Sequence, residues 1–284
     1  MAQNLTNIIY NFNNENFTIY DNSLILMLNF DNRSDLGEND THIKDLSINN
    51  HDVEMISSVA IGDGYYNKGI VVQGNNDGLD LGTGFDFSGT NSFTLSVWVK
   101  QNGNSATHSS LVSKYNRDTA SPKEMSLYIY STGEVVFLRE CIPYNFETNY
   151  ILLNDQWVHL TITYNGSVRT FYLNGLFNNS ESHSCSVTPR PTGITTIGTF
   201  KRNVGYSESF NGTIDEVKIW NRSLSAEEVK LNYLSNLQKY DSTKWFLDIK
   251  QINLTQNNYD YQVFAQNSFG ENGSTKKRSI EIFN

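Results

Sequence analysis

Side chains that could act as nucleophiles, general bases or metal ligands are present, but few stand at the spacing that such chemistry needs. The sequence has no Gly-x-Ser-x-Gly turn for a hydrolase nucleophile and no phosphate-binding loop. Gly82-Thr83-Gly84 begins a dinucleotide-like pattern, yet Phe87 stands where the third glycine belongs. No His-x-His or His-Glu-x-x-His motif occurs, so a zinc hydrolase is not indicated. We expect the histidines to be surface or loop residues: His42, His51, His108, His159 and His183.

Cys141 and Cys185 lie about 44 residues apart, too far for a local Cys-x-x-Cys metal or redox site. They could form one disulfide, which would contribute on the order of 3–4 kcal/mol in an oxidising compartment, or they could be two unrelated thiols. The sequence leaves both alternatives open.

Asn-x-Ser/Thr sequons are somewhat more frequent than chance predicts. A polar, Asn-biased β protein would contain several without carrying glycans, whereas glycosylation would place the chain outside a cell. The candidate glycosylation sites are Asn165, Asn178, Asn211, Asn221, Asn253 and Asn272; further sequons begin at Asn4, Asn16, Asn32 and Asn39.

The composition bounds the class of protein. The chain has 284 residues with 38% hydrophobic content, enough for one large or two modest cores. Its net charge is −9, and no basic patch is dense enough for a nucleic-acid partner. The longest apolar run, Leu24–Leu28, has the length of a strand, so no membrane span is expected.

The elements that must position any site are predicted to be mostly β-strands. Phe93–Val99 and Val158–Tyr164 alternate so that each buries one side. Val168–Leu173 runs into Asn174-Gly175, a dipeptide that favours a tight hairpin turn. One helix is expected after Ser225-Ala226-Glu227-Glu228, which has the pattern of a capping box.

Strand patterns also occupy both ends of the chain. Ile8–Phe12 and Phe17–Tyr20 precede the main pattern, and three more surround Phe246, Tyr261 and Ile280. A one-sided sheet of the last three strands would need partners to cover it. We therefore expect residues 1–22 and 238–284 to form one small sandwich into which residues 23–237 are inserted.

Seven motifs follow one another within residues 23–237. They are Ser23-Leu24-Ile25-Leu26 leading to Phe30-Asp31; Asp45-Leu46-Ser47; Gly64-Tyr65-Tyr66-Asn67-Lys68-Gly69; Phe93–Val99; Gln156-Trp157-Val158-His159 with Thr163-Tyr164-Asn165-Gly166; Phe171-Tyr172-Leu173-Asn174-Gly175; and Phe210–Ser225. Their order closely resembles the laminin-G-like, concanavalin A-like lectin/glucanase family. The resemblance implies an all-β fold, a concanavalin A-like jelly-roll sandwich, with its tryptophans (Trp98, Trp157 and Trp220) in the core.

The flanks resemble the Ig-like modules that accompany such domains in archaeal-type surface proteins. Tyr240-Asp241, Lys244-Trp245, Tyr259–Ala265 and Arg278-Ser279-Ile280 carry this second resemblance. It implies that the jelly roll is inserted in a small Ig-like β-sandwich.

The same superfamily includes retaining glucanases, whose paired carboxylates usually lie in a Glu-x-Asp-x-x-Glu strand. Thr213-Ile214-Asp215-Glu216 lacks the leading Glu, and Glu134 and Glu140 lack the intervening Asp. We therefore predict that the chain is not an enzyme.

The resemblance also implies a structural Ca²⁺, held by Asp31, Gly69 and Asp215. Oxygen ligands from separated segments suit Ca²⁺. Strand alternation would place Asp215 on the core side with Val217 and Ile219, where a buried carboxylate needs a partner. The alternative is that backbone amides satisfy Asp215 without a metal.

Ligand contacts are expected in the loops, where Tyr115, Tyr144 and Tyr206 could stack on a sugar ring. The preferred interpretation is a non-catalytic adhesion module, extracellular or on a cell surface, that binds a glycan or a cell-surface protein. The main alternative is a structural repeat of a surface filament or envelope stalk, in contact with tandem modules or like subunits; a glycan-cleaving enzyme is the minor one.

Overall fold

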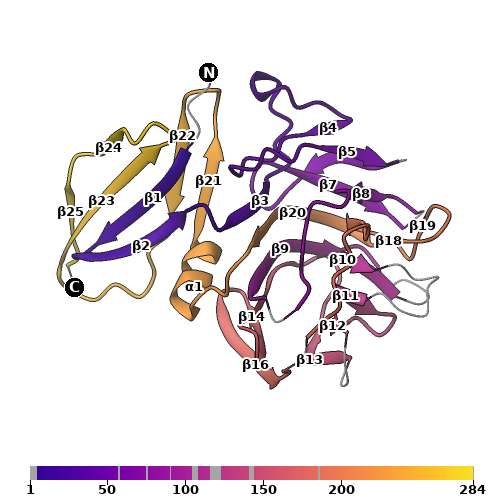
Figure 1. The fold of residues 1–284 in the computed structure, drawn as a ribbon. Helices are drawn as coiled ribbons and strands as arrows, with labels where there is room; N and C mark the ends of the chain where they lie inside the picture. Colours follow the sequence, from indigo (N-terminus) through magenta and orange to yellow (C-terminus); the bar gives the residue numbers. More distant parts are fainter. Residues whose placement is uncertain are drawn as a thin grey trace.

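The computed structural model describes residues 5–56, 58–74, 76–89, 91–103, 108–115, 123–140, 144–184 and 186–283, without the side chains of residues 115 and 123. Its regular structure is almost entirely antiparallel β-strand, which confirms the predicted all-β jelly-roll class. Figure 1 shows the layers side by side: a sheet made by the chain ends, then helix α1 with a hairpin, then the two sheets of the jelly roll.

The middle sheet is the jelly-roll sheet nearer to the chain ends. Its strand order is β16-β15-β14-β9-β20-β7-β6, with β3 beside β20. The strands are β3 (Leu24–Leu28), β6 (Ala60–Asp63), β7 (Lys68–Gln73), β9 (Phe93–Gln101), β14 (Trp157–Tyr164), β15 (Val168–Leu173), β16 (Leu176–Ser182) and β20 (Asn211–Trp220). Asn174 and Gly175 join β15 to β16 with φ of 50° and 76°, so the predicted hairpin is confirmed.

The outer sheet is the second sheet of the jelly roll, with the order β13-β12-β11-β10-β17-β8-β5-β4. Its strands are β4 (His42–Ile43), β5 (Val53–Ile56), β8 (Gly78–Asp80), β10 (His108–Tyr115), β11 (Lys123–Tyr130), β12 (Glu134–Arg139), β13 (Asn145–Ile151) and β17 (Thr195–Ile197). A short hairpin, β18 (Phe200–Lys201) and β19 (Tyr206–Ser207), and a 3₁₀ turn, Ser34–Leu36, complete this part.

The main core lies between the two jelly-roll sheets. Alternate residues of each strand point into it, for example Leu95 and Val97 of β9 and Leu127 and Ile129 of β11, all almost completely buried. The opposite face of the outer sheet is called the far face here, and the opposite face of the middle sheet the module face. The far face and the module face carry the side chains that are considered below as candidate binding residues.

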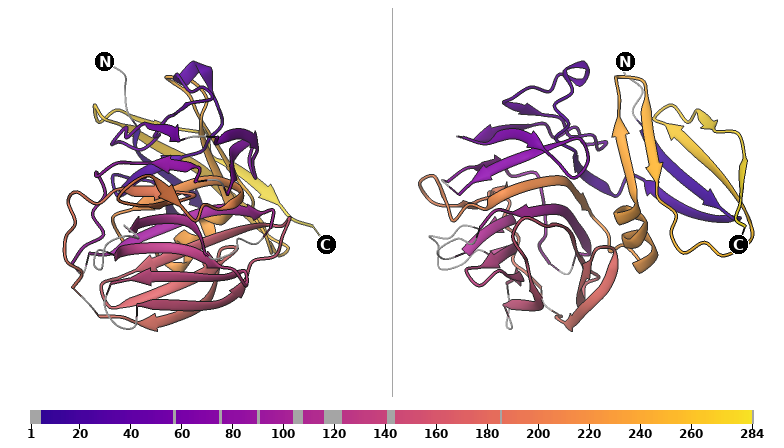
Figure 2. Two further views of the ribbon diagram at one scale, coloured as in Figure 1. Left: turned by 90° about the vertical axis from the view of Figure 1, so that its right-hand side faces the viewer. Right: turned by 180° about the vertical axis from the view of Figure 1, so that it is seen from behind.

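The chain ends form one terminal sheet. β1 (Leu5–Phe12) pairs with both β2 (Glu15–Tyr20) and β23 (Asn258–Asn267), which also pairs with β24 (Asn272–Ser274) and β25 (Arg278–Glu281). β21 (Ser235–Lys239) and β22 (Trp245–Ile249) form a separate hairpin between this sheet and the jelly roll (Figure 2). The predicted boundary at residues 237/238 falls within β21, and the Ig-like character of the terminal sheet stays a prediction.

Helix α1 (Ala226–Leu234) begins as its sequence predicts. The Ser225 hydroxyl accepts from the Glu228 N–H at 3.2 Å, and the Glu228 carboxylate accepts from the Ser225 N–H at 2.8 Å, which confirms the capping box. Val229 is buried against the module face. The helix therefore docks on the jelly roll and leads directly into β21.

A second core joins the terminal sheet, α1 and the module face. Its buried members include Ile8 of β1, Tyr20 of β2, Trp220 of β20 and Val229 of α1. The tryptophans of the jelly roll belong to this side: Trp98 and Trp220 are buried on the module face, outside the main core, and Trp157 is half-buried. Trp98 and Trp220 are therefore buried as the resemblance implies, Trp220 in the second core rather than the main one, whereas Trp157 is not fully buried.

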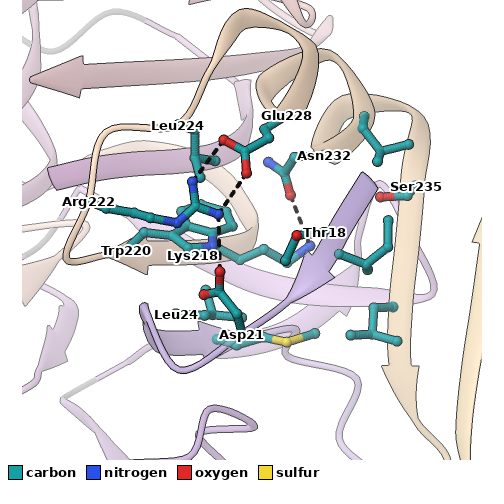
Figure 3. Close-up of a pocket in the computed structure, with 14 residues that line it drawn as sticks. Thr18, Asp21, Leu24, Lys218, Trp220, Arg222, Leu224, Glu228, Asn232 and Ser235 are labelled. Carbon is teal, nitrogen blue, oxygen red and sulfur yellow. Dashed lines mark hydrogen bonds and ion pairs between the residues drawn. The ribbon is translucent and has the colours of Figure 1, made fainter. Parts of the chain in front are cut away.

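Ion pairs lie at the edge of the second core, where the terminal sheet, α1 and the jelly roll meet. Figure 3 shows the Arg222 guanidinium between the Glu228 carboxylate, at 2.7 and 2.8 Å, and the Asp21 carboxylate, at 3.2 Å. The neighbouring cavity measures about 20 Å³, and Lys218 and Asn232 are among the residues that line it. It has room for one water molecule among polar partners.

Candidate functional site

Strand β20 carries the acidic residues predicted to bind calcium, and a β-bulge sets their direction. The pairing of β20 with β9 shifts between Asp215 and Lys218, and Glu216 has a φ of 49°. Asp215 lies opposite Trp98 on the module face, while Val217 points into the main core. The expectation that Asp215 shares the core side is therefore wrong, because the extra residue reverses the alternation.

The buried Asp215 carboxylate holds the turn between β6 and β7. Its Oδ2 accepts from the N–H groups of Tyr65 at 2.9 Å and Tyr66 at 3.0 Å, and its Oδ1 accepts from the Glu216 N–H at 2.8 Å. Gly64 fits here because a Cβ would lie only 2.6 Å from Oδ2. Backbone amides thus satisfy much of this carboxylate.

The three predicted ligands lie in one region. The Asp31 Oδ1 accepts from the Lys68 N–H at 3.4 Å, next to Gly69. A Cβ on Gly69 would lie 2.9 Å from the carbonyl oxygen of Ile214, the residue before Asp215. The chain therefore brings β3, β7 and β20 together at this point.

Burial and mutual repulsion act on these carboxyl groups. Burial, followed by the Glu216 charge, raises the pKa of Asp31 to about 6, and the same two causes raise the pKa of Asp215. Burial also raises the pKa of Glu216, opposed by the Lys218 ammonium at 2.8 Å. A cation here would relieve the repulsion.

The donor set around these carboxylates consists of oxygens. The Asn29 Oδ1 is buried and makes no hydrogen bond, while its Nδ2 donates to Asp31 Oδ2 at 3.0 Å. Among the described residues, no three His, Cys, Asp or Glu side chains converge as a metal centre. A Ca²⁺ would therefore need amide or carbonyl oxygens beside the carboxylates, which suits its coordination.

The predicted tyrosines lie at separate places. The Tyr206 hydroxyl donates to Asp80 Oδ2 at 2.6 Å, and burial together with that carboxylate raises the pKa of Tyr206. The Tyr144 side chain is 46% exposed just before β13. Tyr115 is the last residue of β10, and its side chain is not among those that the structure describes. Cys141 and Cys185, the candidate disulfide partners, lie outside the described residues.

The candidate glycosylation asparagines are mostly accessible. Asn165, Asn178, Asn221, Asn253 and Asn272 are exposed, and Asn211 is half-buried at the start of β20. Exposure is a condition for glycan attachment, and it leaves glycosylation a prediction.

The sequence interpretation missed an aromatic group on the far face. The rings of Tyr128 and Tyr130 on β11 meet edge to face with centroids 5.4 Å apart, and His108 on β10 lies 5.6 and 5.4 Å from them. The Asn145 Nδ2 donates to the Tyr130 hydroxyl at 2.9 Å. Their alternation with Leu127 and Ile129 is the signal that could have found them.

Hydroxyl groups continue this far face towards Tyr206. Ser113 Oγ lies 3.1 Å from Thr196 Oγ1, and Ser209 Oγ donates to Thr199 Oγ1 at 2.9 Å. Thr199 Oγ1 in turn donates to the Ser207 carbonyl at 3.2 Å. These side chains are almost completely buried, so the network stabilises this part of the outer sheet and offers few hydroxyls to a ligand.

Two histidines expected at the surface are buried, namely His159 and His183. His159 Nε2 lies 2.7 Å from Ser96 Oγ, which also accepts from Asn232 Nδ2 at 2.8 Å. Burial, with the Lys218 charge, lowers the pKa of His159 to about 3, so its ring is neutral. This serine–histidine contact lies beneath α1, where it anchors the helix.

Residues 73–230, more than half of the chain, match the family model of the concanavalin A-like lectin/glucanases superfamily. The chain belongs to this superfamily. No curated protein matches the chain. No helix among the described residues is long and apolar enough to cross a membrane.

Solved structures share this superfamily's fold. Domain 4 of AbnA, a GH43 extracellular arabinanase from Geobacillus stearothermophilus in complex with arabinotriose, is 20% identical, with a TM-score of 0.55 over 73% of this chain and 96% of that one. The binding domain of Paraclostridial Mosquitocidal Protein 1 is 22% identical, with a TM-score of 0.58 over 74% and 52%. Trypanosoma rangeli sialidase with sialic acid is 14% identical, with a TM-score of 0.57 over 76% and 33%.

These similarities correct one prediction. The prediction that the chain is not an enzyme, which rested on the missing carboxylate motif, is wrong, because the same fold occurs in chains of an arabinanase and of sialidases. The chain spans about half of the mosquitocidal binding domain and a third of the sialidase. At these identities the likeness shows the fold.

Proposed function

We propose that this superfamily member recognises glycans through the far face of its outer sheet, as part of a secreted or surface-exposed protein. The observation that carries the proposal is the pair of half-buried rings of His108 and Tyr130, which pack on the buried Tyr128, with the Asn145 amide on the Tyr130 hydroxyl. Sugar rings present apolar C–H faces and hydroxyl edges, so they suit rings flanked by hydrogen-bonding groups. The similarity to an arabinanase domain that holds arabinotriose supports the same ligand class.

A glycan array tests this function. The intact protein is expected to bind a restricted set of glycans, and Tyr130→Ala to weaken that binding about tenfold or more, as truncation of a central aromatic contact typically does. Phe269→Ala removes a ring that is 60% exposed in the terminal sheet and is the matched control. A blank array, or equal losses in both variants, would contradict the proposal.

We further propose that a structural Ca²⁺ sits beside Asp31 and Asp215. The ion would link the segment that follows β3 to β20, and it would neutralise carboxylates that repel one another. Its binding free energy would add to the stability of the folded chain, because the unfolded chain lacks the site.

Metal-free protein is expected to melt at a higher temperature near pH 5 than near pH 7.5. The folded pKa of Asp31 is about 6, above its ordinary value of 3.8, so this stabilisation is complete below the ordinary pKa and lost as pH rises through about 6. Calcium at 100 times its Kd should raise the Tm near neutral pH by roughly 5 °C or more. Differential scanning calorimetry measures both effects.

Asp31→Asn is the matched variant for this experiment. It removes the Asp31 titration and a proposed Ca²⁺ ligand, so both the acid stabilisation and the calcium effect should shrink. An unchanged Tm when EGTA is added to calcium-loaded protein would argue against the bound ion.

A further inference from the structure

A second aromatic group lies on the module face, on the opposite side of the jelly roll from the proposed glycan site. The Tyr65 ring stacks on Trp98 with centroids 3.4 Å apart and an interplanar angle of 11°, and Trp157 stands across Tyr65 at 6.0 Å and 71°. Trp98 is buried whereas Tyr65 is 39% exposed. The Tyr66 ring also meets Tyr65 edge to face, with centroids 4.7 Å apart. Tyr65, Trp98 and Trp157 form what we call the aromatic platform.

The chain holds the platform rigidly. The buried Asp215 carboxylate accepts from the Tyr65 and Tyr66 N–H groups, so the turn that carries Tyr65 is anchored to β20. Tyr233 of α1 also packs against Trp98, with centroids 5.4 Å apart. A ring that is already fixed loses little conformational entropy when a ligand stacks on it.

Polar groups surround the platform. The Lys100 ammonium lies 5.3 Å from the centroid of a Trp157 ring. The Lys68 ammonium and the Asp63 carboxylate pair at 2.8 Å across the same β6–β7 turn, with both side chains well exposed. Lys100 also interacts electrostatically with Asp63. The surroundings therefore offer two ammonium groups as hydrogen-bond donors and one carboxylate as an acceptor.

We propose that the aromatic platform is a second carbohydrate-binding site, which takes a neutral sugar ring stacked on Tyr65. The flat, preformed ring matches the apolar face of a sugar, and the neighbouring ammonium and carboxylate groups can donate to and accept from its hydroxyls. Asp215 is a positioning residue for this site, because it acts through the backbone of Tyr65. The inference is independent of the far face.

Calorimetric titration with arabinotriose, cellotetraose, xylotetraose and chitotetraose tests the second site. The Tyr130→Ala protein should still bind at least one of these sugars, because its platform is intact. Adding Tyr65→Ala or Trp157→Ala should weaken that remaining affinity about tenfold or more, whereas Tyr65→Phe should retain it because the stacking ring stays.

Circular dichroism and the Tm of each variant separate a lost contact from a lost fold, and Tyr65→Phe supplies a folded comparison. Phe269→Ala is again the control, at an exposed ring between β23 and β24. Failure of all four sugars to bind Tyr130→Ala protein, or unchanged affinity in folded Tyr65→Ala and Trp157→Ala variants, would overturn the second site. A protein ligand that needs Tyr65 while the sugars do not bind would do the same.

Discussion

Glu124→Gln is expected to lower the free energy of unfolding by about 3–5 kcal/mol, the largest single effect we foresee in the outer sheet. Glu124 and Lys114 form an ion pair at 3.0 Å with side chains 0% and 2% exposed. The carboxylate also accepts from the N–H groups of Phe87 at 3.1 Å and Arg190 at 2.7 Å. The amide would leave the Lys114 charge buried without a counter-charge.

Urea unfolding followed by tryptophan fluorescence measures this loss. Lys277→Gln breaks an exposed pair with Asp260 at 2.7 Å and is the matched control, expected to leave the free energy of unfolding nearly unchanged. The double change Lys114→Met with Glu124→Met should cost less than Glu124→Gln alone, because no unpaired charge remains. A loss below about 1 kcal/mol in Glu124→Gln would contradict the buried pair.

Trp220→Ala is expected to cost about 3–5 kcal/mol and to loosen the terminal sheet together with the jelly roll. Trp220 is 4% exposed in the second core, where it joins Ile8 and Tyr20 of the terminal sheet and Val229 of α1. Its removal would leave a cavity shared by both parts. The physical reason for the coupling is that neither part buries this core alone.

Calorimetry distinguishes coupled from independent unfolding. The whole chain should show one transition, which Trp220→Ala shifts without splitting, while Phe246→Ala at a 59% exposed ring should change stability by about 0.5 kcal/mol or less. A chain shortened to residues 23–237 should melt at a lower temperature than the whole chain. Two separate transitions in the whole chain, or no loss on shortening, would show that the second core does not couple them.

Features that depend on a few neighbouring residues were predictable from sequence. The capping box at Ser225 and Glu228 and the turn at Asn174-Gly175 were predicted correctly, since their hydrogen bonds and φ angles are set locally. The order of short motifs was sufficient for the superfamily, because each motif marks a strand whose alternation follows the pleat.

The face to which a side chain points was harder to predict than the type of secondary structure that carries it. The bulge at Glu216 turned Asp215 to the opposite face from the one expected, and a bulge arises from how two strands pair rather than from the letters of one. His159 was expected at the surface, but α1 covers the face on which it lies. In both cases a distant segment sets the environment.

The sequence alone was therefore enough for an all-β jelly roll, one capped helix and strands at both ends. The arrangement in space was needed to show the aromatic group at Tyr130, the platform at Tyr65 and the second core that ties the chain ends to the jelly roll. The reason is that strand patterns encode which side chains alternate, whereas the partner of each face is set by contacts between segments far apart in the chain.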